Sequence, residues 1–370
     1  MNIKSLIFII LILALLVAGA YFAYNYFFQS ESTTESGNEI TIQPQTSQRL
    51  IPLSKEKVLA PAIDESGKKI KYYDKATGNM HAVNFNGTNA SALSTAKLAG
   101  ILKILWSPDK NKVIGFFKEG EQLKKYLHDY QTGKSISLTE QIEQAVWSPD
   151  NNKIAVQTYD QGKNTSTISV ANANGEALKP IFQTRIKDLI LEWPAIDKIS
   201  IRTKPSGLSE GLIFIANPDN GDFRSILKGS YGLIARWSPL GNLLLYSSTN
   251  FEGKNIRLST ISHDGQNQRD LGIATLADKC VFSQDNRTLF CAVPQKLSEN
   301  AVWPDDYYKG LTVTSDTFWK INLDTGQKDA ILSPDPLGKS YDATELLLSP
   351  EEDYFFFVNK KDGLLYGLTL

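Results

Sequence analysis

Short apolar runs alternate with clusters of turn-forming residues along the chain from about residue 49 onward. Two clusters are identical, because Trp-Ser-Pro-Asp occupies Trp106–Asp109 and recurs at Trp147–Asp150. Weaker copies lie on either side, and aligning all copies on the large apolar residue that opens each one gives Ile63, Trp106, Trp147, Trp193, Trp237, Phe282 and Leu348. The steps between them are 43, 41, 46, 44, 45 and 66 residues. A period in the low forties is typical of propeller blades.

Each copy predicts four β-strands. After the anchor residue, Ser or Asp can cap a turn through its side chain, and Pro sets the backbone angle of the first turn position. An apolar run then follows, as in Lys153–Val156 and Tyr354–Val358, and such runs are typical of buried strands. A third strand commonly ends in a second turn rich in Asp, Asn and Gly, such as Asn172–Gly175. The predicted fold class is therefore all-β, a β-propeller with the anchor tryptophans in its core.

The repeats resemble those of the WD40-like, TolB-type propeller family, whose signature is Trp-Ser-Pro-Asp-Gly before an apolar strand. The resemblance covers residues 49–370, and the copies at Trp106 and Trp147 match four of the five letters. This class includes partner-binding periplasmic propellers and the gating domains of some serine peptidases. The resemblance therefore implies a fold more than an activity.

Seven copies predict seven blades, with six or eight as the alternatives. The last copy supplies three strands before the sequence ends at Leu370. Either Ile40–Ile42 or Leu50–Leu53 could supply the missing strand. Such pairing would join the two ends of the chain in one blade and remove an exposed edge.

The N-terminal segment predicts the compartment. Leu6–Phe28 contains 23 residues without a charge, and a helix of about 35 Å is long enough to cross a hydrocarbon layer of about 30 Å. Lys4 precedes the segment and no Lys or Arg follows it before Arg49. The positive-inside rule then places the N-terminus in the cytoplasm and the propeller outside. We expect residues 1–28 to be a single-pass anchor in the cell membrane. A signal peptide cleaved at Ala18-Gly19-Ala20 is the alternative.

Composition defines the remaining domains. Residues 29–48 are rich in Ser, Thr, Gln and Glu and cannot build a core, which predicts a flexible stalk. Residues 49–370 form the predicted propeller, and the 42% hydrophobic content of the chain suffices for a large core. A formal net charge of -1 argues against a general affinity for nucleic acid.

The two cysteines, Cys280 and Cys291, flank the turn of the sixth copy. If Phe282 faces Leu289 across the hairpin, the same register places Cys280 opposite Cys291. A disulfide is then geometrically allowed, and an extracytoplasmic location would permit it. Two small, buried, reduced side chains are the alternative, and the sequence slightly favours them.

The sequence shows no known signature of catalysis or of cofactor binding. The sequence contains no Gly-x-Ser-x-Gly, Walker, His-Glu-x-x-His or dinucleotide motif. His81, His128 and His263 fall in different copies, and we interpret them as surface residues near turns rather than as metal ligands. No cofactor, metal or catalytic residue is predicted.

The long step between Phe282 and Leu348 predicts an inserted loop between strands 288–293 and 317–323. Strand direction places the insert on the face that carries the loops between second and third strands. The insert holds Trp303, Asp305, Asp306, Tyr307 and Tyr308, and aromatics beside carboxylates suit a protein or sugar contact. In the alternative interpretation, Trp303 and the tyrosines fold back to cover their own blade.

Two classes of function remain. The first is a membrane-tethered scaffold or binding module for a protein, a peptide or a cell-envelope glycan. The second is a lyase- or glycosidase-type enzyme with its site in the central funnel. We prefer the binding module because the polar residues show no spacing that a catalytic constellation requires.

Overall fold

A computed structural model describes residues 49–94, 98–333 and 338–370, which belong to one compact unit, Gln45–Leu370. Their strands form five four-stranded sheets and one seven-stranded sheet. The first three sheets follow the chain order, and every pair of neighbouring strands within them is antiparallel. They consist of β2 (Val58–Ile63), β3 (Lys69–Asp74), β4 (Met80–Asn84) and β5 (Ser91–Ala92); β6 (Ile101–Trp106), β7 (Lys112–Glu119), β8 (Gln122–Asp129) and β9 (Lys134–Leu138); and β10 (Ile142–Trp147), β11 (Lys153–Asp160), β12 (Thr165–Asn172) and β13 (Lys179–Thr184).

The seven-stranded sheet contains one strand of 15 residues, β17, which pairs with β16 at its start and with β18 at its end. This sheet consists of β14 (Leu189–Ala195), β15 (Lys198–Thr203), β16 (Glu210–Ala216), β17 (Phe223–Trp237), β18 (Leu243–Thr249), β19 (Arg257–Ser262) and β20 (Arg269–Asp270). The 3-10 helix η1 (Ala277–Lys279) follows, and then the sheet of β21 (Cys280–Phe282), β22 (Thr288–Pro294), β23 (Asp316–Asn322) and β24 (Lys328–Leu332), with the short helix α2 (Asp305–Tyr308) between β22 and β23.

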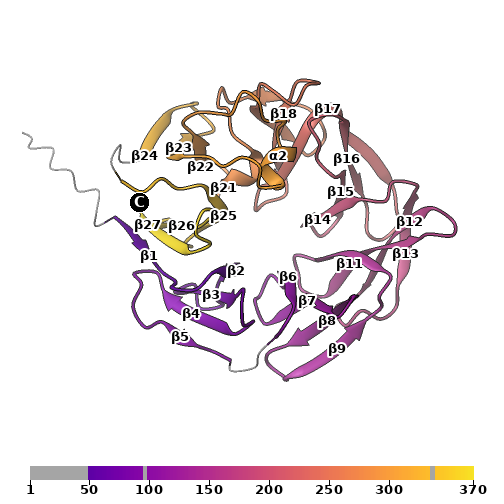
Figure 1. Cartoon of the computed structure of the whole chain (residues 1–370). Coiled ribbons are helices and arrows are strands. Elements are labelled where there is room, and N and C mark those ends of the chain that lie inside the picture. The colour runs from indigo at the N-terminus through magenta and orange to yellow at the C-terminus, as the bar shows by residue number, and fades with distance from the viewer. Residues whose placement is uncertain (1–48, 95–97, 334–337) are drawn as a thin grey trace, which may run out of the picture. The chain divides into compact units, whose positions relative to one another are not determined.

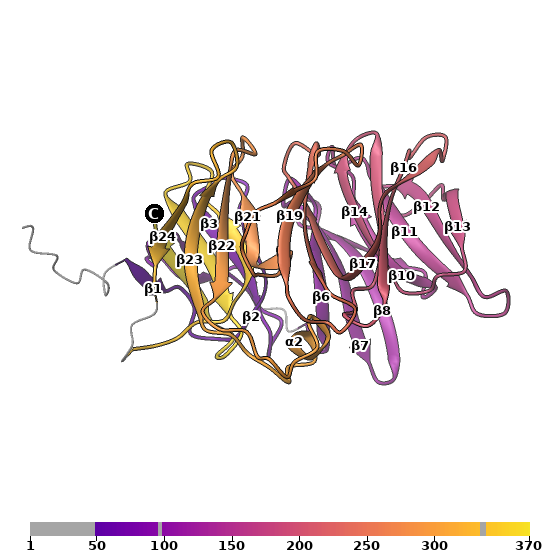
Figure 2. The same cartoon turned by 90° about the horizontal axis from the view of Figure 1, so that it is seen from above.

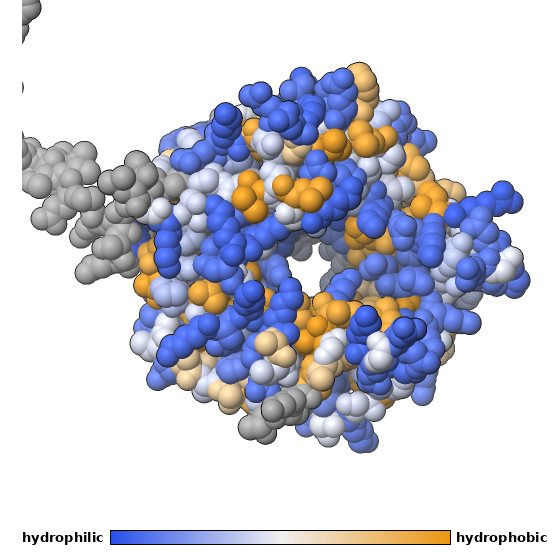
Figure 3. Space-filling model, in the orientation of Figure 1, coloured by the Kyte–Doolittle hydropathy of each residue, from blue (hydrophilic) through white to orange (hydrophobic). Residues whose placement is uncertain are grey.

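The sheets stand in a ring around a central opening (Figure 1), and the space-filling view shows that side chains leave this channel open (Figure 3). One strand of each sheet lies on the inside: β2, β6, β10 and β14 contact one another in sequence, and β25 (Ala343–Leu348) contacts both β21 and β2. Seen from the side, the strands run between the two faces of a disc (Figure 2). The all-β propeller architecture predicted from the repeats is confirmed.

The Ser-Pro-Asp turns explain why the repeats fold into hairpins. The Ser148 hydroxyl donates a hydrogen bond to the Asp150 carboxylate at 2.6 Å and accepts one from the Lys153 backbone N–H at 2.9 Å. The bond from Ser148 lowers the pKa of Asp150. Ser283 and Asp285 repeat the arrangement in the sixth copy, also at 2.6 Å. One serine hydroxyl therefore forms hydrogen bonds both to the carboxylate of the turn and to the backbone N–H of the first residue of the next strand.

The core is a series of apolar layers between neighbouring sheets. Ile114 and Phe116 of β7 pack against Trp147 and Val156 of the next sheet, for example. Two anchor indoles also cross between sheets, because the Trp106 Nε1–H donates to the Ala60 carbonyl at 2.9 Å and the Trp147 Nε1–H to the Leu105 carbonyl at 3.0 Å. Trp147, Trp193 and Trp237 are buried, and Trp106 is partly buried.

The two ends of the described chain meet in one sheet. β1 (Leu50–Pro52) pairs with β27 (Leu365–Thr369), which pairs in turn with β26 (Tyr354–Asn359) and β25. The predicted closure is thus confirmed for Leu50–Leu53, whereas Ile40–Ile42, the other candidate, lies outside the described residues.

The predicted membrane anchor at Leu6–Phe28 and the predicted stalk at residues 29–48 also lie outside the described residues. Within the part of the chain that the structure describes, no helix has the length and apolar character needed to cross a membrane.

We predict that β1 holds the ring closed. A chain that starts at Ser54 loses the β1–β27 ladder and the buried Leu53 side chain, whose backbone N–H bonds the Leu365 carbonyl at 2.8 Å. Its thermal midpoint should fall by at least several degrees, since a lost strand and a lost buried leucine together cost a few kcal/mol. The matched control starts at Arg49 and keeps β1. Equal midpoints for the two truncated chains would show that β1 does not stabilise the ring.

Candidate functional site at the channel mouth

The insert between β22 and β23 reaches well beyond its own sheet. The Gly207 backbone N–H, in the β15–β16 loop, donates to the Asp305 carboxylate at 2.6 Å. The Trp303 backbone N–H donates to the Gly253 carbonyl, in the β18–β19 loop, at 2.8 Å. On the other side, Lys360 after β26 donates to the Tyr307 carbonyl. These contacts confirm that the insert shares a face with the loops between second and third strands, and Figure 1 places α2 next to the central opening.

The five insert residues predicted for binding have different surroundings. Trp303 and Tyr307 are each only 2% exposed, and their rings stack with centroids 5.7 Å apart. The Asp305 carboxylate accepts a hydrogen bond from the Gly207 backbone N–H, and the Asp306 carboxylate accepts one from the Val302 backbone N–H at 2.8 Å. Tyr308 is 47% exposed. Trp303 and Tyr307 thus anchor the insert, as the alternative interpretation expected, and Tyr308 presents an aromatic surface.

A buried ion cluster fixes Tyr307 in place. The Lys279 ammonium, 1% exposed, lies 2.8 Å from the Asp342 carboxylate and 2.9 Å from that of Asp316. The Tyr307 hydroxyl donates to Asp342 at 2.6 Å. Burial, together with the Asp342 carboxylate, raises the pKa of Tyr307, so this phenol stays protonated. Burial also raises the pKa of Asp316. On Asp342 the effect of burial is exceeded by Lys279 together with hydrogen bonds from Tyr307 and Thr314, and the pKa of that carboxyl is lowered.

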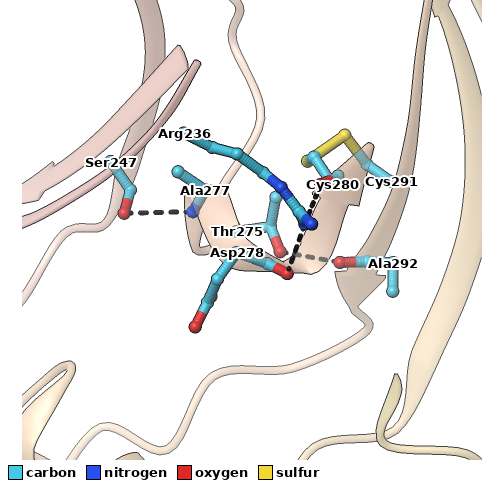
Figure 4. Close-up of a disulfide and its surroundings, with 8 residues drawn as sticks. All are labelled: Arg236, Ser247, Thr275, Ala277, Asp278, Cys280, Cys291 and Ala292. Atoms are coloured by element: carbon cyan, nitrogen blue, oxygen red, sulfur yellow. Dashed lines mark hydrogen bonds between the residues drawn. A yellow bond between two sulfur atoms is a disulfide. The ribbon is translucent and has the colours of Figure 1, made fainter. Parts of the chain in front are cut away.

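A second group of charges, which we name the channel cluster, consists of Glu192, Arg202, Arg236 and Asp278. Glu192 and Arg202 lie on β14 and β15 with Oε2 and Nε 3.7 Å apart. The Arg236 Nη1–H, from the end of β17, donates to the Cys280 carbonyl at 2.8 Å and to the Asp278 carbonyl at 3.5 Å (Figure 4). The Tyr308 hydroxyl donates to the Asp278 carboxylate at 2.5 Å, so the insert and the channel cluster form one surface.

Several polar atoms of the channel cluster are buried without a hydrogen-bond partner in the protein. They are the Glu192 Oε2, the Arg202 Nε and Nη1, and the Asp278 Oδ1. Burial raises the pKa of Glu192 more than Arg202 and Arg236 lower it, and burial lowers the pKa of Arg236. Buried polar groups are normally paired. Unpaired donors and acceptors side by side are therefore suited to binding a polar ligand or ordered water.

The channel cluster was missed in the sequence, although a signal for it exists. The residue directly before the anchor is charged in two of the seven copies, at Glu192 and Arg236. It is apolar in the other five copies, which have Ala62, Leu105, Val146, Val281 and Leu347 at this position. A charge at this register interrupts the apolar pattern of an inner strand. Arg202 and Asp278 have no comparable signal, because only the packing of neighbouring sheets brings them to the same place.

The cysteines lie beside the channel cluster. Cys280 and Cys291 are directly opposite each other across β21 and β22, as the register predicted, and their sulfur atoms are joined in a disulfide (Figure 4). The expectation of two reduced thiols, which the sequence slightly favoured, is not met. The pairing of β21 with β22 brings the two Cα atoms to 4.1 Å, which allows the sulfur atoms to meet.

The histidines lie in separate sheets. His81 and His128 are within β4 and β8, and His263 is in the turn after β19. In the described ranges 49–94, 98–333 and 338–370, no group of three or more His, Cys, Asp or Glu side chains is placed to hold a metal ion.

Comparison with known proteins supports the fold. No protein-family model and no curated protein sequence matches this chain. Among solved structures, an oligogalacturonate lyase in complex with manganese is similar with a TM-score of 0.62 and 14% identity, over 87% of this chain and 93% of the lyase chain. The β-propeller domain of the trilobed protease from Pyrococcus furiosus gives 0.56 and 12%, over 84% and 92%. The Swd1 β-propeller domain from Myceliophteria thermophila gives 0.55 and 10%, over 87% and 99%. The resemblance to WD40-type propellers is therefore confirmed at the level of the fold.

We predict that Lys279→Met strongly destabilises the protein. The substitution leaves the Asp316 and Asp342 carboxylates buried without their counter-charge, which typically costs about 3–5 kcal/mol. Lys163→Met is the matched control, because Lys163 is exposed and solvent screens its pair with Asp160, so its loss should leave the stability nearly unchanged. Urea unfolding at neutral pH measures both variants. A loss below about 1 kcal/mol for Lys279→Met would contradict the structural role of this lysine.

We also predict that alkylation of the denatured, unreduced protein detects no free thiol at Cys280 or Cys291. Removing the bridge in a Cys280→Ala/Cys291→Ala variant should lower the free energy of unfolding by about 2–4 kcal/mol, because the unfolded chain is no longer constrained. Reduced wild-type protein serves as the control and should lose a similar amount. Two reactive thiols in the unreduced protein would rule out the disulfide.

Proposed function

We propose that this protein is a binding module whose ligand site is the channel mouth on the insert side. The insert supports this proposal most directly. It contacts the loops of neighbouring sheets through Asp305, Trp303 and Tyr307, and it holds Tyr308 beside Asp278. Long, ordered loops on a rigid scaffold are frequently functional.

The chemistry of the channel cluster supports a polar, hydrogen-bonding ligand. The Arg202 Nη1 and the Asp278 Oδ1 are buried without a hydrogen-bond partner in the protein, and Glu192 and Arg202 form only a long ion pair of 3.7 Å. Hydroxyl and amide groups both donate and accept, so they match such a surface, and the exposed ring of Tyr308 can pack against the ligand. A peptide or protein segment and a cell-envelope glycan both meet these requirements.

We further propose a seven-bladed ring, in which the start of β17 closes the fourth blade and its end opens the fifth. Counted in this way, the seven-stranded sheet is two blades that share one strand.

We also propose that the propeller is tethered outside the cytoplasm by a single-pass anchor at Leu6–Phe28. The uncharged run supports the anchor, and the disulfide supports an oxidising compartment.

The test compares variants of the full-length protein in detergent. Partners are captured by crosslinking in the native membrane and identified, and binding of the identified partner is then measured. Tyr308→Ala and Asp278→Asn should each weaken binding by about 1–3 kcal/mol, since they remove a central aromatic and its hydrogen-bonded acceptor. Leu240→Ala is the control, because Leu240 is exposed in the Ser-Pro turn on the opposite face.

Two outcomes would count against the proposal. Equal binding by Tyr308→Ala, Asp278→Asn and Leu240→Ala would exclude the channel mouth as the ligand site. Turnover of oligogalacturonate or another glycan that is abolished by a single channel-cluster substitution would instead indicate a propeller enzyme, the alternative function, with its site in the same funnel.

A further inference from the structure

An apolar pocket separates the sheet of β2–β5 from the sheet of β6–β9. Its volume is about 360 Å³, and its lining extends from Tyr73 of β3 to Ser135 of β9, with no residue of the insert. Tyr73, Ile104 and Val113 form its buried floor. The pocket becomes accessible near Ser135, an exposed residue on β9.

The pocket coincides with an irregularity in the repeat. In five copies of the repeat, the structure shows which second-strand residue pairs with the position two before the anchor, and these residues are Gly115, Val156, Ile201, Tyr246 and Cys291. The other four side chains are all buried, between neighbouring sheets. Gly115 has no side chain; the Phe117 ring lies against it instead, 2.4 Å from the position of a Cβ, and the pocket remains beside these two residues.

The walls of the pocket are mostly aromatic. Phe117, Tyr126 and Tyr130 surround the space above the floor, and the Tyr73 and Tyr130 hydroxyls contact each other. Near the opening, the His128 Nδ1 and the Ser135 hydroxyl form a hydrogen bond of 2.9 Å. The pocket therefore combines flat apolar walls with a small polar group at one end, which is the usual composition of a small-molecule site.

The size of the pocket indicates the size of the ligand. A cavity of about 150 Å³ lined by apolar side chains accepts benzene, so about 360 Å³ can accept two fused rings. Natural cores seldom contain empty space of this size, because the lining side chains lose their packing partners. Occupation by an apolar molecule would restore those contacts.

We propose that the pocket beside Gly115 binds a small planar aromatic molecule that carries one hydroxyl group. The ring system packs against the walls that Phe117, Tyr126 and Tyr130 form, and its hydroxyl bonds His128 or Ser135 at the open end. This site is separate from the channel mouth, and the inference does not depend on the proposed function.

The experiment measures calorimetric binding of 2-naphthol and of naphthalene to the full-length protein in detergent. We expect one saturable site, with 2-naphthol binding more tightly than naphthalene. In Gly115→Ala the new Cβ lies 2.4 Å from the Phe117 ring, so the ring must move, and 2-naphthol affinity should fall at least tenfold. Gly162→Ala is the matched control, since its Cβ meets its nearest neighbour at 3.5 Å. It should bind like wild type.

A second variant tests the proposal independently, in case Gly115→Ala misfolds. Ser135→Trp places a large side chain at the exposed rim and should block entry without changing the buried floor, as an unchanged thermal midpoint would show. No saturable 2-naphthol binding to the wild type, or equal binding to wild type, Gly115→Ala and Ser135→Trp, would overturn the proposal. Equal affinity for naphthalene and 2-naphthol would contradict the proposed hydrogen bond between the ligand hydroxyl and His128 or Ser135.

Discussion

Every sheet in this protein has two apolar faces, and neither face can be buried unless another sheet packs against it. This constraint requires a ring, because an open row of sheets would leave two apolar faces in water. The layer between the last sheet and the first closes the ring and buries the faces that would otherwise be exposed. Phe356 and Leu365 pack there against Ile70 and Tyr72, and the pairing of β1 with β27 ties the two chain ends into the same sheet. The other layers depend on this closure.

Once the ring is closed, its inner strands and one set of loops converge on a channel mouth. The insert lies at this mouth. It extends across the loops of neighbouring sheets and is held by a lysine that is almost completely buried with two carboxylates. Such a cluster tolerates no loss of a member, since each remaining charge would be stranded away from water. The rigid attachment of Tyr307 allows Tyr308, the next residue, to be presented at a defined position beside Asp278.

The two candidate sites arise from departures from the repeat. At the channel, Glu192 and Arg236 replace the apolar residue that other copies place before the anchor. Between the first two sheets, Gly115 stands where four other copies place a buried side chain. A repeated structure makes such departures informative, because the other copies show what packing alone requires.

The sequence by itself determined the architecture. Turn residues and strand periodicity act locally, so the Trp-Ser-Pro-Asp copies specify each hairpin, and the offset from Phe282 to Leu289 correctly placed Cys280 opposite Cys291. The long step after Phe282 also correctly located the insert. Only the tertiary structure decided that Trp303 and Tyr307 are anchors while Tyr308 is exposed, and that Arg202 pairs with Glu192 and Tyr308 with Asp278. These outcomes depend on contacts between residues up to about a hundred positions apart, such as Gly207 with Asp305. Local patterns carry no information about such contacts, because they form only when separate sheets pack around a common axis.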